Sequence, residues 1–152
     1  KTGTGTVNYL GLFKVYDAEL YTPPVLHSSA VLSEATSRCL VLRYDLDLSA
    51  EDIIKGANAV LKRQNSQEML DKISVYIDAV HNSYTNVQSG DSYTLCYDAP
   101  SSTTKLLFNN EEVVSINSTL FAKIYFGIWL DSREPISETL RDNLLAQLTV
   151  NN

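Results

Sequence analysis

The sequence predicts an α+β domain in which helices pack on one face of an antiparallel sheet. Two kinds of hydrophobic pattern support this fold class. Runs in which apolar and polar residues alternate are typical of half-buried strands, and apolar residues three or four apart are typical of helices. These runs follow the order strands, two helices, strands, two helices. The 152 residues contain no repeat and no flexible linker, so we expect one domain over residues 1–152.

Two alternating runs predict the first strands. From Thr6 to Tyr21 the apolar side carries Leu10, Leu12, Tyr16, Ala18 and Leu20. Pro23 and Pro24 end this run, because neither proline can donate a backbone hydrogen bond to a neighbouring strand. From Arg38 to Leu48 the apolar side carries Leu40, Leu42, Tyr44, Leu46 and Leu48. Both runs therefore indicate strands with one buried face.

Two helices are predicted after these strands. Ser49 is a typical N-cap, and the residues after it at helical spacing are Ile53, Ile54, Ala57, Val60 and Leu61. Asn65-Ser66 ends this helix and caps a second one, whose apolar residues are Met69, Leu70, Ile73, Ile77, Val80 and Tyr84.

The second group of strands follows a turn at Gln88–Asp91. The first of them places Tyr93, Leu95 and Tyr97 on one face. The runs 105–108 and 113–116 predict a hairpin that turns at Asn109-Asn110, since Asn tolerates positive φ better than most residues.

Two helices complete the chain. The stretch from Ser118 to Leu130 is apolar on all sides, which predicts a buried helix. The stretch from Ser137 to Leu148 is amphipathic, so we expect it to lie on the surface of the core.

The charge balance excludes several classes of function. The chain has 18 acidic and 12 basic residues, a net charge of -6. Strong nucleic-acid binding and adhesion to anionic membranes both need a surplus of Lys and Arg, so we expect neither. No apolar run reaches the ~20 residues that span a bilayer, so no membrane span is predicted.

The two cysteines leave their pairing open. Cys39 and Cys96 are 57 positions apart with no neighbouring His, which excludes a zinc site built on paired cysteines. Each lies in a predicted strand. A disulfide and two buried free thiols are both compatible with this placement.

No catalytic, metal or cofactor site is predicted. His27 and His81 are the only histidines, and neither has a second ligand at helical or hairpin spacing. We expect both at the surface or at a helix end. The sequence has no nucleophile elbow, and Gly3 and Gly5 precede a strand rather than the helix that a phosphate-binding loop needs.

Tyr16 is the candidate for a binding role, because it faces the apolar side of its strand. A buried phenol needs a hydrogen-bond partner. It could be a core residue bonded to a backbone carbonyl, or a residue in an apolar cleft that holds a carbonyl or carboxylate of a ligand. Lys14, two residues before it, would help to bind an anion if its ammonium reached the cleft, or would extend into solvent.

Several stretches resemble bacterial chalcone isomerase-like proteins. They are Phe13–Tyr21, Val87–Asp91, Phe121–Lys123, Gly127–Leu130 and the pair Leu144-Leu145. The resemblance covers nearly the whole chain. It implies an open-faced β-sandwich, in which a large curved antiparallel sheet carries helices on one face and a ligand cleft lies between them. Members of this family include isomerases of flavonoid synthesis, fatty-acid-binding proteins and many exported bacterial proteins.

The residues of the isomerases are mostly not retained. By position, their first-strand Arg corresponds to Asn8 and their second-strand Thr to Tyr16. The remaining positions fall near Glu51, between Gly56 and Asn58, and near Asn110. Asn58 alone could be retained. The resemblance therefore implies a non-catalytic member, with these candidate ligand-binding residues: Tyr16, Asn8, Lys14 and Asn58.

Three functions follow from this sequence. The first is a non-catalytic protein that binds a small apolar or acyl ligand in the cleft. The second is an envelope protein-interaction module, whose cleft is filled by Phe121, Tyr125, Phe126 and Trp129 to below about 300 Å³. The third is an isomerase or lyase that uses Tyr16 as a general acid, which requires a lowered pKa.

The compartment is predicted from the first residue and from the resemblance. The chain begins with Lys1 rather than Met, so we expect that an N-terminal segment has been removed, either a signal peptide by processing or another segment. Together with the family, this predicts a periplasmic or secreted bacterial protein.

Overall fold

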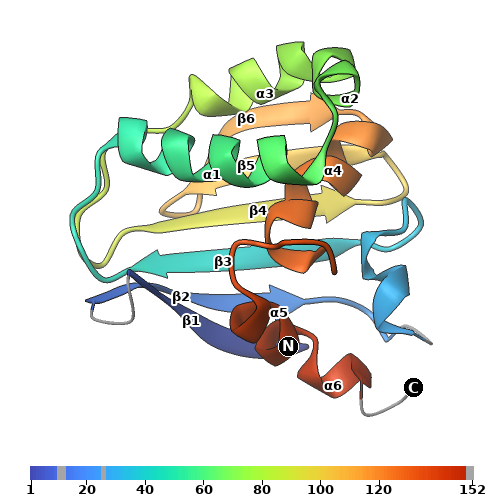
Figure 1. Cartoon of the computed structure of the whole chain (residues 1–152), viewed down its shortest axis with the longest axis horizontal. Coiled ribbons are helices and arrows are strands. Elements are labelled where there is room, and N and C mark those ends of the chain that lie inside the picture. The colour runs from blue at the N-terminus through green and yellow to red at the C-terminus, as the bar shows by residue number, and fades with distance from the viewer. Residues whose placement is uncertain (10–12, 25–26, 150–152) are drawn as a thin grey trace.

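Six strands form one antiparallel sheet, paired in sequence order (Figure 1). The computed structural model describes residues 1–9, 13–24 and 27–149, except the side chains of residues 8, 9, 13 and 149. The strands are β1 (Gly3–Tyr9), β2 (Phe13–Tyr21), β3 (Arg38–Tyr44), β4 (Ser92–Asp98), β5 (Thr103–Phe108) and β6 (Glu111–Asn117). The helices are the 3-10 helix η1 (Ser28–Leu32), α1 (Ala50–Gln64), α2 (Gln67–Lys72), α3 (Ser74–His81), α4 (Thr119–Leu130), α5 (Glu138–Leu144) and α6 (Ala146–Thr149).

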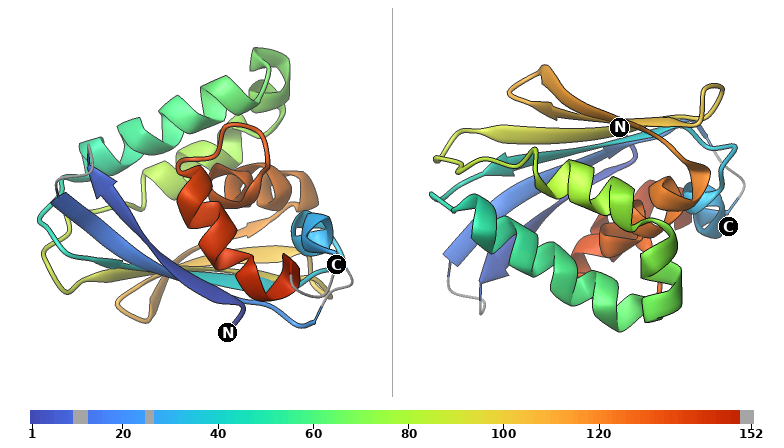
Figure 2. Two further views of the ribbon diagram at one scale, coloured as in Figure 1. Left: turned by 60° about the horizontal axis from the view of Figure 1, so that its bottom comes forward. Right: turned by 90° about the horizontal axis from the view of Figure 1, so that it is seen from above.

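The helices lie on one side of the sheet, as the right-hand view of Figure 2 shows. Helices α1 to α3 are inserted between β3 and β4, and α4 and α5 follow β6. Despite the insertion, β3 and β4 are directly paired. This arrangement confirms the predicted α+β fold with helices on one face of an antiparallel sheet.

The alternating run predicted from Thr6 to Tyr21 is two paired strands rather than one. Tyr16 lies opposite Val7, and Lys14 lies opposite Asn8, so Val15 is an extra residue that forms a β-bulge. A bulge shifts by one residue which side chains face the core. Because Val15 is apolar, the sequence pattern does not reveal this shift. Tyr16, Ala18 and Leu20 are buried as predicted, whereas Leu10 and Leu12 lie outside the described residues.

Strand β3 ends at Tyr44, four residues before the predicted end. Tyr44 exchanges its last backbone hydrogen bonds on the β4 side with Gly90 and Asp91, and the N–H of Asp45 donates to the carbonyl of Val15 in β2 at 2.8 Å. Leu48 instead exchanges backbone hydrogen bonds with Val87, at 3.0 and 2.8 Å. This separate bridge closes the loop that leads into α1.

Serine caps begin the predicted helices. The side chains of Ser49, Ser66, Ser118 and Ser137 each accept a hydrogen bond from the backbone N–H three residues later. The second predicted helix is in fact two, α2 and α3, separated at Ile73, whose φ of -117° and ψ of 13° are not helical. Helical spacing continues across this break, so the pattern does not reveal it. Tyr84 lies beyond the end of α3 rather than within the helix.

Helix α4 forms the centre of the core, as its apolar composition predicts. The side chains of Phe121, Ala122, Tyr125, Phe126, Ile128 and Leu130 are all buried. Helix α5 packs closely on β1, where a Cβ atom at Gly3 would overlap the backbone carbonyls of Asn143 and Leu144. Glycine at this position therefore allows the last helices to lie against the edge of the sheet.

The two tight turns follow the prediction. Asn109 and Asn110 have φ values of 48° and 71° and connect β5 to β6 as a two-residue hairpin loop. In the predicted turn before β4, the N–H of Asp91 donates to the carbonyl of Gln88 at 2.9 Å, and Gly90 has a φ of 97°.

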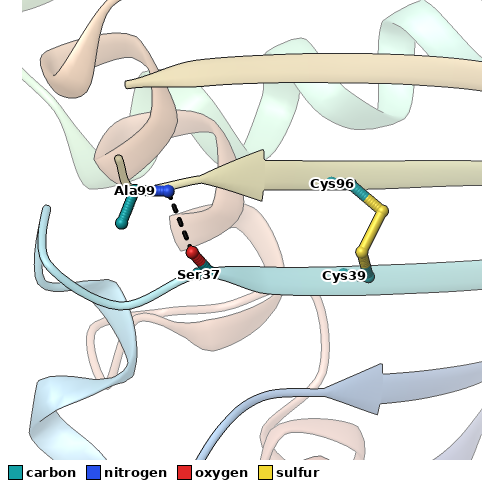
Figure 3. The surroundings of a disulfide bond; sticks show 4 residues. All are labelled: Ser37, Cys39, Cys96 and Ala99. Carbon is teal, nitrogen blue, oxygen red and sulfur yellow. Dashed lines mark hydrogen bonds between the residues drawn. A yellow bond between two sulfur atoms is a disulfide. The ribbon is translucent and has the colours of Figure 1, made fainter. Parts of the chain in front are cut away.

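A disulfide between Cys39 and Cys96 joins β3 to β4 (Figure 3). The two residues are direct partners in the register and lie on the face of the sheet opposite the helices. Beside them, the N–H of Ala99 donates to Oγ of Ser37 at 2.9 Å. The structure thus decides between the two alternatives that the sequence leaves open.

Candidate ligand cavity

A cavity of about 600 Å³ lies between the sheet and the helices. The strands contribute Val7, Val15, Tyr16, Leu40, Leu42, Tyr44, Tyr93, Leu95 and Leu106. Helices α1 and α4 and the loops contribute Leu46, Leu48, Asp52, Ile53, Gly56, Ala57, Tyr84, Ile128, Trp129 and Ile136. Asp52 and Gly56 are exposed, so the cavity opens beside the first half of α1. Its volume lies within the range of about 300–1,000 Å³ that small-molecule sites occupy.

Only part of the space between the layers is filled. Phe121, Tyr125 and Phe126 of α4 are fully buried in the core and do not line the cavity. Trp129, one turn further along, forms part of its wall. The volume exceeds the limit of about 300 Å³ expected for a filled cleft. The expectation that side chains of α4 fill the cleft is therefore wrong.

The cavity wall is apolar and almost uncharged. Aliphatic and aromatic side chains make up most of it, and Asp52 at the opening is the one charged residue among the described lining residues. No Lys, Arg or His belongs to this lining. A wall of this kind favours a ligand with a large apolar surface and few polar atoms.

Four tyrosines form a continuous cluster along the cavity. The ring centroids of Tyr16 and Tyr44 are 5.4 Å apart, those of Tyr44 and Tyr93 are 6.2 Å apart, and those of Tyr93 and Tyr84 are 5.1 Å apart. Strand alternation predicts the inward position of Tyr16, Tyr44 and Tyr93. Tyr84 was expected in a helix, and its place in the cavity depends on the loop after α3.

Tyr97, the fourth tyrosine predicted on an apolar strand face, is buried outside this cavity. Its hydroxyl donates to the carbonyl of Glu34 at 2.7 Å. The guanidinium of Arg38 lies between the rings of Tyr97 and Phe126, at 4.6 and 4.5 Å from their centroids. This group belongs to the core at the end of the sheet.

Tyr16 is held in place by Trp129 of α4. The indole Nε1 donates to the Tyr16 hydroxyl at 2.9 Å, across the layers of the fold. Burial raises the pKa of Tyr16, and the hydrogen bond from Trp129 only partly opposes this. A general acid in this cavity requires the opposite shift of the pKa, so the environment of Tyr16 does not support the isomerase or lyase alternative.

We expect this hydrogen bond to contribute about 1 kcal/mol to the free energy of unfolding. A double-mutant cycle of Tyr16→Phe, Trp129→Phe and the double variant, measured by urea unfolding, isolates that coupling. The double variant should lose about 1 kcal/mol less than the sum of the losses of the two single variants. Strictly additive losses would contradict the interaction.

The other predicted binding residues do not gather at Tyr16. Lys14 lies on the outer face of the sheet, where its Nζ is 3.1 Å from Asp17 and 3.7 Å from Asp45. The expectation that Lys14 shares the side of Tyr16 is wrong, because the bulge at Val15 lies between them. Asn58 on α1 is half-buried and outside the cavity lining. The side chain of Asn8 lies outside the described part of the structure.

His81 is the last residue of α3, in line with the helix-end position expected for it, but its side chain is buried in the core rather than at the surface. Its Nε2 lies 3.2 Å from the hydroxyl of Tyr125, which shares a 2.7 Å hydrogen bond with the hydroxyl of Tyr84. Burial lowers the pKa of His81 and so favours its neutral form. Its spacing of four residues from Ile77 is the sequence signal that places it on the buried face. His27 is exposed, as expected.

The described residues contain neither a metal-binding cluster nor a membrane-spanning helix. No group of three or more His, Cys, Asp or Glu side chains is arranged to hold a metal ion in the described part of the chain. No helix within the same residues has the length and apolar composition that crossing a bilayer requires.

Comparison with known proteins identifies similar folds and sequences. The sequence model of a family described as chalcone isomerase-like matches residues 2–146. A crystal structure of a fatty-acid binding protein from Arabidopsis thaliana is similar to this chain, with a TM-score of 0.67 and 16% identity. The match covers 98% of this chain and 89% of that protein. No curated protein sequence is significantly similar to this chain.

Proposed function

Because this chain belongs to the chalcone isomerase-like family, we propose that it is a non-catalytic member that binds a small, largely apolar or acyl ligand. The observation that carries this proposal is the cavity of about 600 Å³ between sheet and helices, with its nearly uncharged wall. At the roughly 30 Å³ that a water molecule occupies in the liquid, this volume corresponds to a ligand of at most about 20 non-hydrogen atoms.

The similar Arabidopsis protein supports the acyl part of the proposal. Its printed name describes a fatty-acid binding protein, and it shares the fold over nearly the whole of this chain. The same fold therefore accommodates an acyl chain in at least one protein. At 16% identity, the likeness supports a ligand between the layers and not the identity of that ligand.

The polar groups of the cavity support binding rather than catalysis. Burial raises the pKa of Tyr16, Tyr44 and Tyr84, so each is a neutral phenol at physiological pH. No cation lies among the described lining residues to stabilise an anionic nucleophile or intermediate. These phenols can orient a bound molecule by hydrogen bonds.

Native mass spectrometry after gentle purification tests the proposal. We expect a co-purified molecule in the complex, and a rise in Tm when apolar ligands are added to the delipidated protein, since a ligand that binds only the folded state stabilises it. A clean apo mass, together with no change in Tm across a panel of fatty acids, alcohols, ketones and aromatic compounds, would overturn it.

Gly56 offers a matched pair of variants for the same test. A Cβ at Gly56 meets no atom within 4 Å, and the residue lies at the opening of the cavity. We expect Gly56→Ala to stabilise α1 by about 1 kcal/mol through helix propensity, with ligand affinity unchanged. Gly56→Trp should fold equally well and lower the affinity at least tenfold, because the indole obstructs the opening. Equal affinities of the two variants would contradict this position of the opening.

We also propose that the protein works in an oxidising compartment, the periplasm or the outside of the cell. The Cys39–Cys96 disulfide supports this, since such bonds persist where thiols are not kept reduced. Alkylation of intact host cells followed by mass mapping tests it. Both cysteines should resist alkylation until a reductant is added, and alkylation without reductant would contradict the proposal.

A further inference from the structure

Tyr44 carries a polar group in the cavity that no other described group satisfies. Its side chain is 5% exposed and lines the cavity wall, and its hydroxyl has no hydrogen-bond partner among the described residues. In the described part of the chain, the side-chain atoms that have neither a hydrogen-bond partner nor contact with solvent are Nε and Nη2 of Arg38 and Oγ1 of Thr104. The Tyr44 hydroxyl is not one of these atoms. It is therefore accessible from the cavity that Tyr44 lines, and it can donate a hydrogen bond to a molecule inside it.

Tyr16 places a second phenol ring beside that of Tyr44. The two residues are direct partners across β2 and β3, and their rings are 5.4 Å apart at an angle of 67°. The Tyr16 oxygen accepts the N–H of Trp129, which leaves its own hydrogen to be donated. Both phenols therefore present a donor on the same part of the wall. A carbonyl oxygen has two lone pairs and can accept from two donors.

The charges around this pair of phenols disfavour an anion. The basic residues nearest to the pair along β2 and β3, Lys14 and Arg43, lie on the opposite face of the sheet. There Lys14 forms ion pairs with Asp17 and Asp45, and Arg43 pairs with Glu19. The one charged residue of the described lining is an acid, Asp52. Residues 8–13, which include the undescribed loop, have no ionisable side chain except the phenol of Tyr9. A carboxylate moved into this cavity would lose its hydration without gaining a cation.

From these observations we infer that the cavity selects a medium-length apolar chain that carries a neutral acceptor oxygen, such as a ketone, an aldehyde or an ester. Tyr44 and Tyr16 donate to that oxygen, and the corresponding carboxylate binds less tightly. This inference rests on the proposed ligand-binding function and specifies the chemical class of the ligand. It separates this chain from binders that hold the charged head of a fatty acid.

Two probes of equal chain length, 2-dodecanone and dodecanoate, test the inference at pH 7.5. Each is titrated against the delipidated protein carrying the neutral fluorescent probe N-phenyl-1-naphthylamine, and its dissociation constant is taken from the displacement. We expect the ketone to bind at least tenfold more tightly than the carboxylate. Equal or tighter binding of dodecanoate would overturn the inference and leave the ligand-binding function intact. If the delipidated protein binds neither the probe nor either compound, the ligand-binding function itself fails.

Variants then test the two donors. Tyr44→Phe should lower the affinity for 2-dodecanone three- to tenfold, because one hydrogen bond to the neutral oxygen is lost. Tyr16→Phe combined with Tyr44→Phe should lower the affinity for the ketone further than Tyr44→Phe alone. Tyr97→Phe, which also deletes a buried phenol hydroxyl but lies outside the cavity, is the matched control and should retain the wild-type affinity for the ketone. A Tyr44→Phe protein with wild-type affinity for the ketone would overturn the role of these donors.

Discussion

Removing the Cys39–Cys96 bond should lower the free energy of unfolding by about 4 kcal/mol. The bond closes a loop of 57 residues. Chain-entropy estimates give roughly 3 kcal/mol for a 15-residue loop and roughly 4.7 kcal/mol for a 100-residue loop. Because β3 and β4 remain paired by their backbone ladder, the folded state of Cys39→Ser/Cys96→Ser should be retained. The loss should therefore arise mainly from the greater freedom of the unfolded chain.

Urea unfolding of this double variant measures the loss. Val41 and Thr94 form the next outward-facing pair on the same two strands, so Val41→Ser/Thr94→Ser is the matched control. It removes side-chain contacts without removing a cross-link, and we expect it to cost about 1 kcal/mol. If the cysteine variant lost no more than this control, the cross-link would contribute nothing beyond its side chains.

The sequence predicts most of the sheet and the helix starts because these depend on local patterns. Strand alternation places Tyr44 and Tyr93 correctly, and four serines mark the starts of helices. Both signals act within a few residues of the chain. They need no knowledge of what packs against them.

The cavity itself could not be predicted in this way, because it depends on the volumes of side chains from distant segments. Large aromatic residues of α4 fill one half of the space between the layers, while Gly56 and Ala57 leave the other half open beneath α1. Two small residues one after the other on a core-facing helix are a signal for such a space. Its meaning becomes clear only once the opposing strands are known.

The error at Lys14 has a similar origin. Counting by twos along β2 places Lys14 with Tyr16, and one extra residue at Val15 moves it to the opposite face. Because valine suits either face, the sequence carries no trace of the bulge. This single residue determines whether the cavity contains a cation, so it bears directly on the class of ligand proposed above.

Phe121 connects the helices of the filled half of the core. Its side chain is 0% exposed, and its ring stacks on that of Tyr125 with centroids 5.1 Å apart and an angle of 20°. It also contacts the edge of Tyr76 on α3, with centroids 6.3 Å apart. These aromatic contacts link α4 to α3, and neither Phe121 nor Tyr76 is among the residues that line the cavity.

Phe121→Ala should lower the free energy of unfolding by about 3–5 kcal/mol, because it removes a fully buried ring and leaves a void. In a chain of this size that corresponds to a fall in Tm of about 6–20 °C. Val75→Ala, on the exposed side of α3 with 67% of the residue accessible, should change the stability by less than about 0.5 kcal/mol. Since Phe121 does not line the cavity, the rise in Tm on ligand binding should persist in the variant. A loss of that rise would mean that the filled and open halves of the core do not act independently.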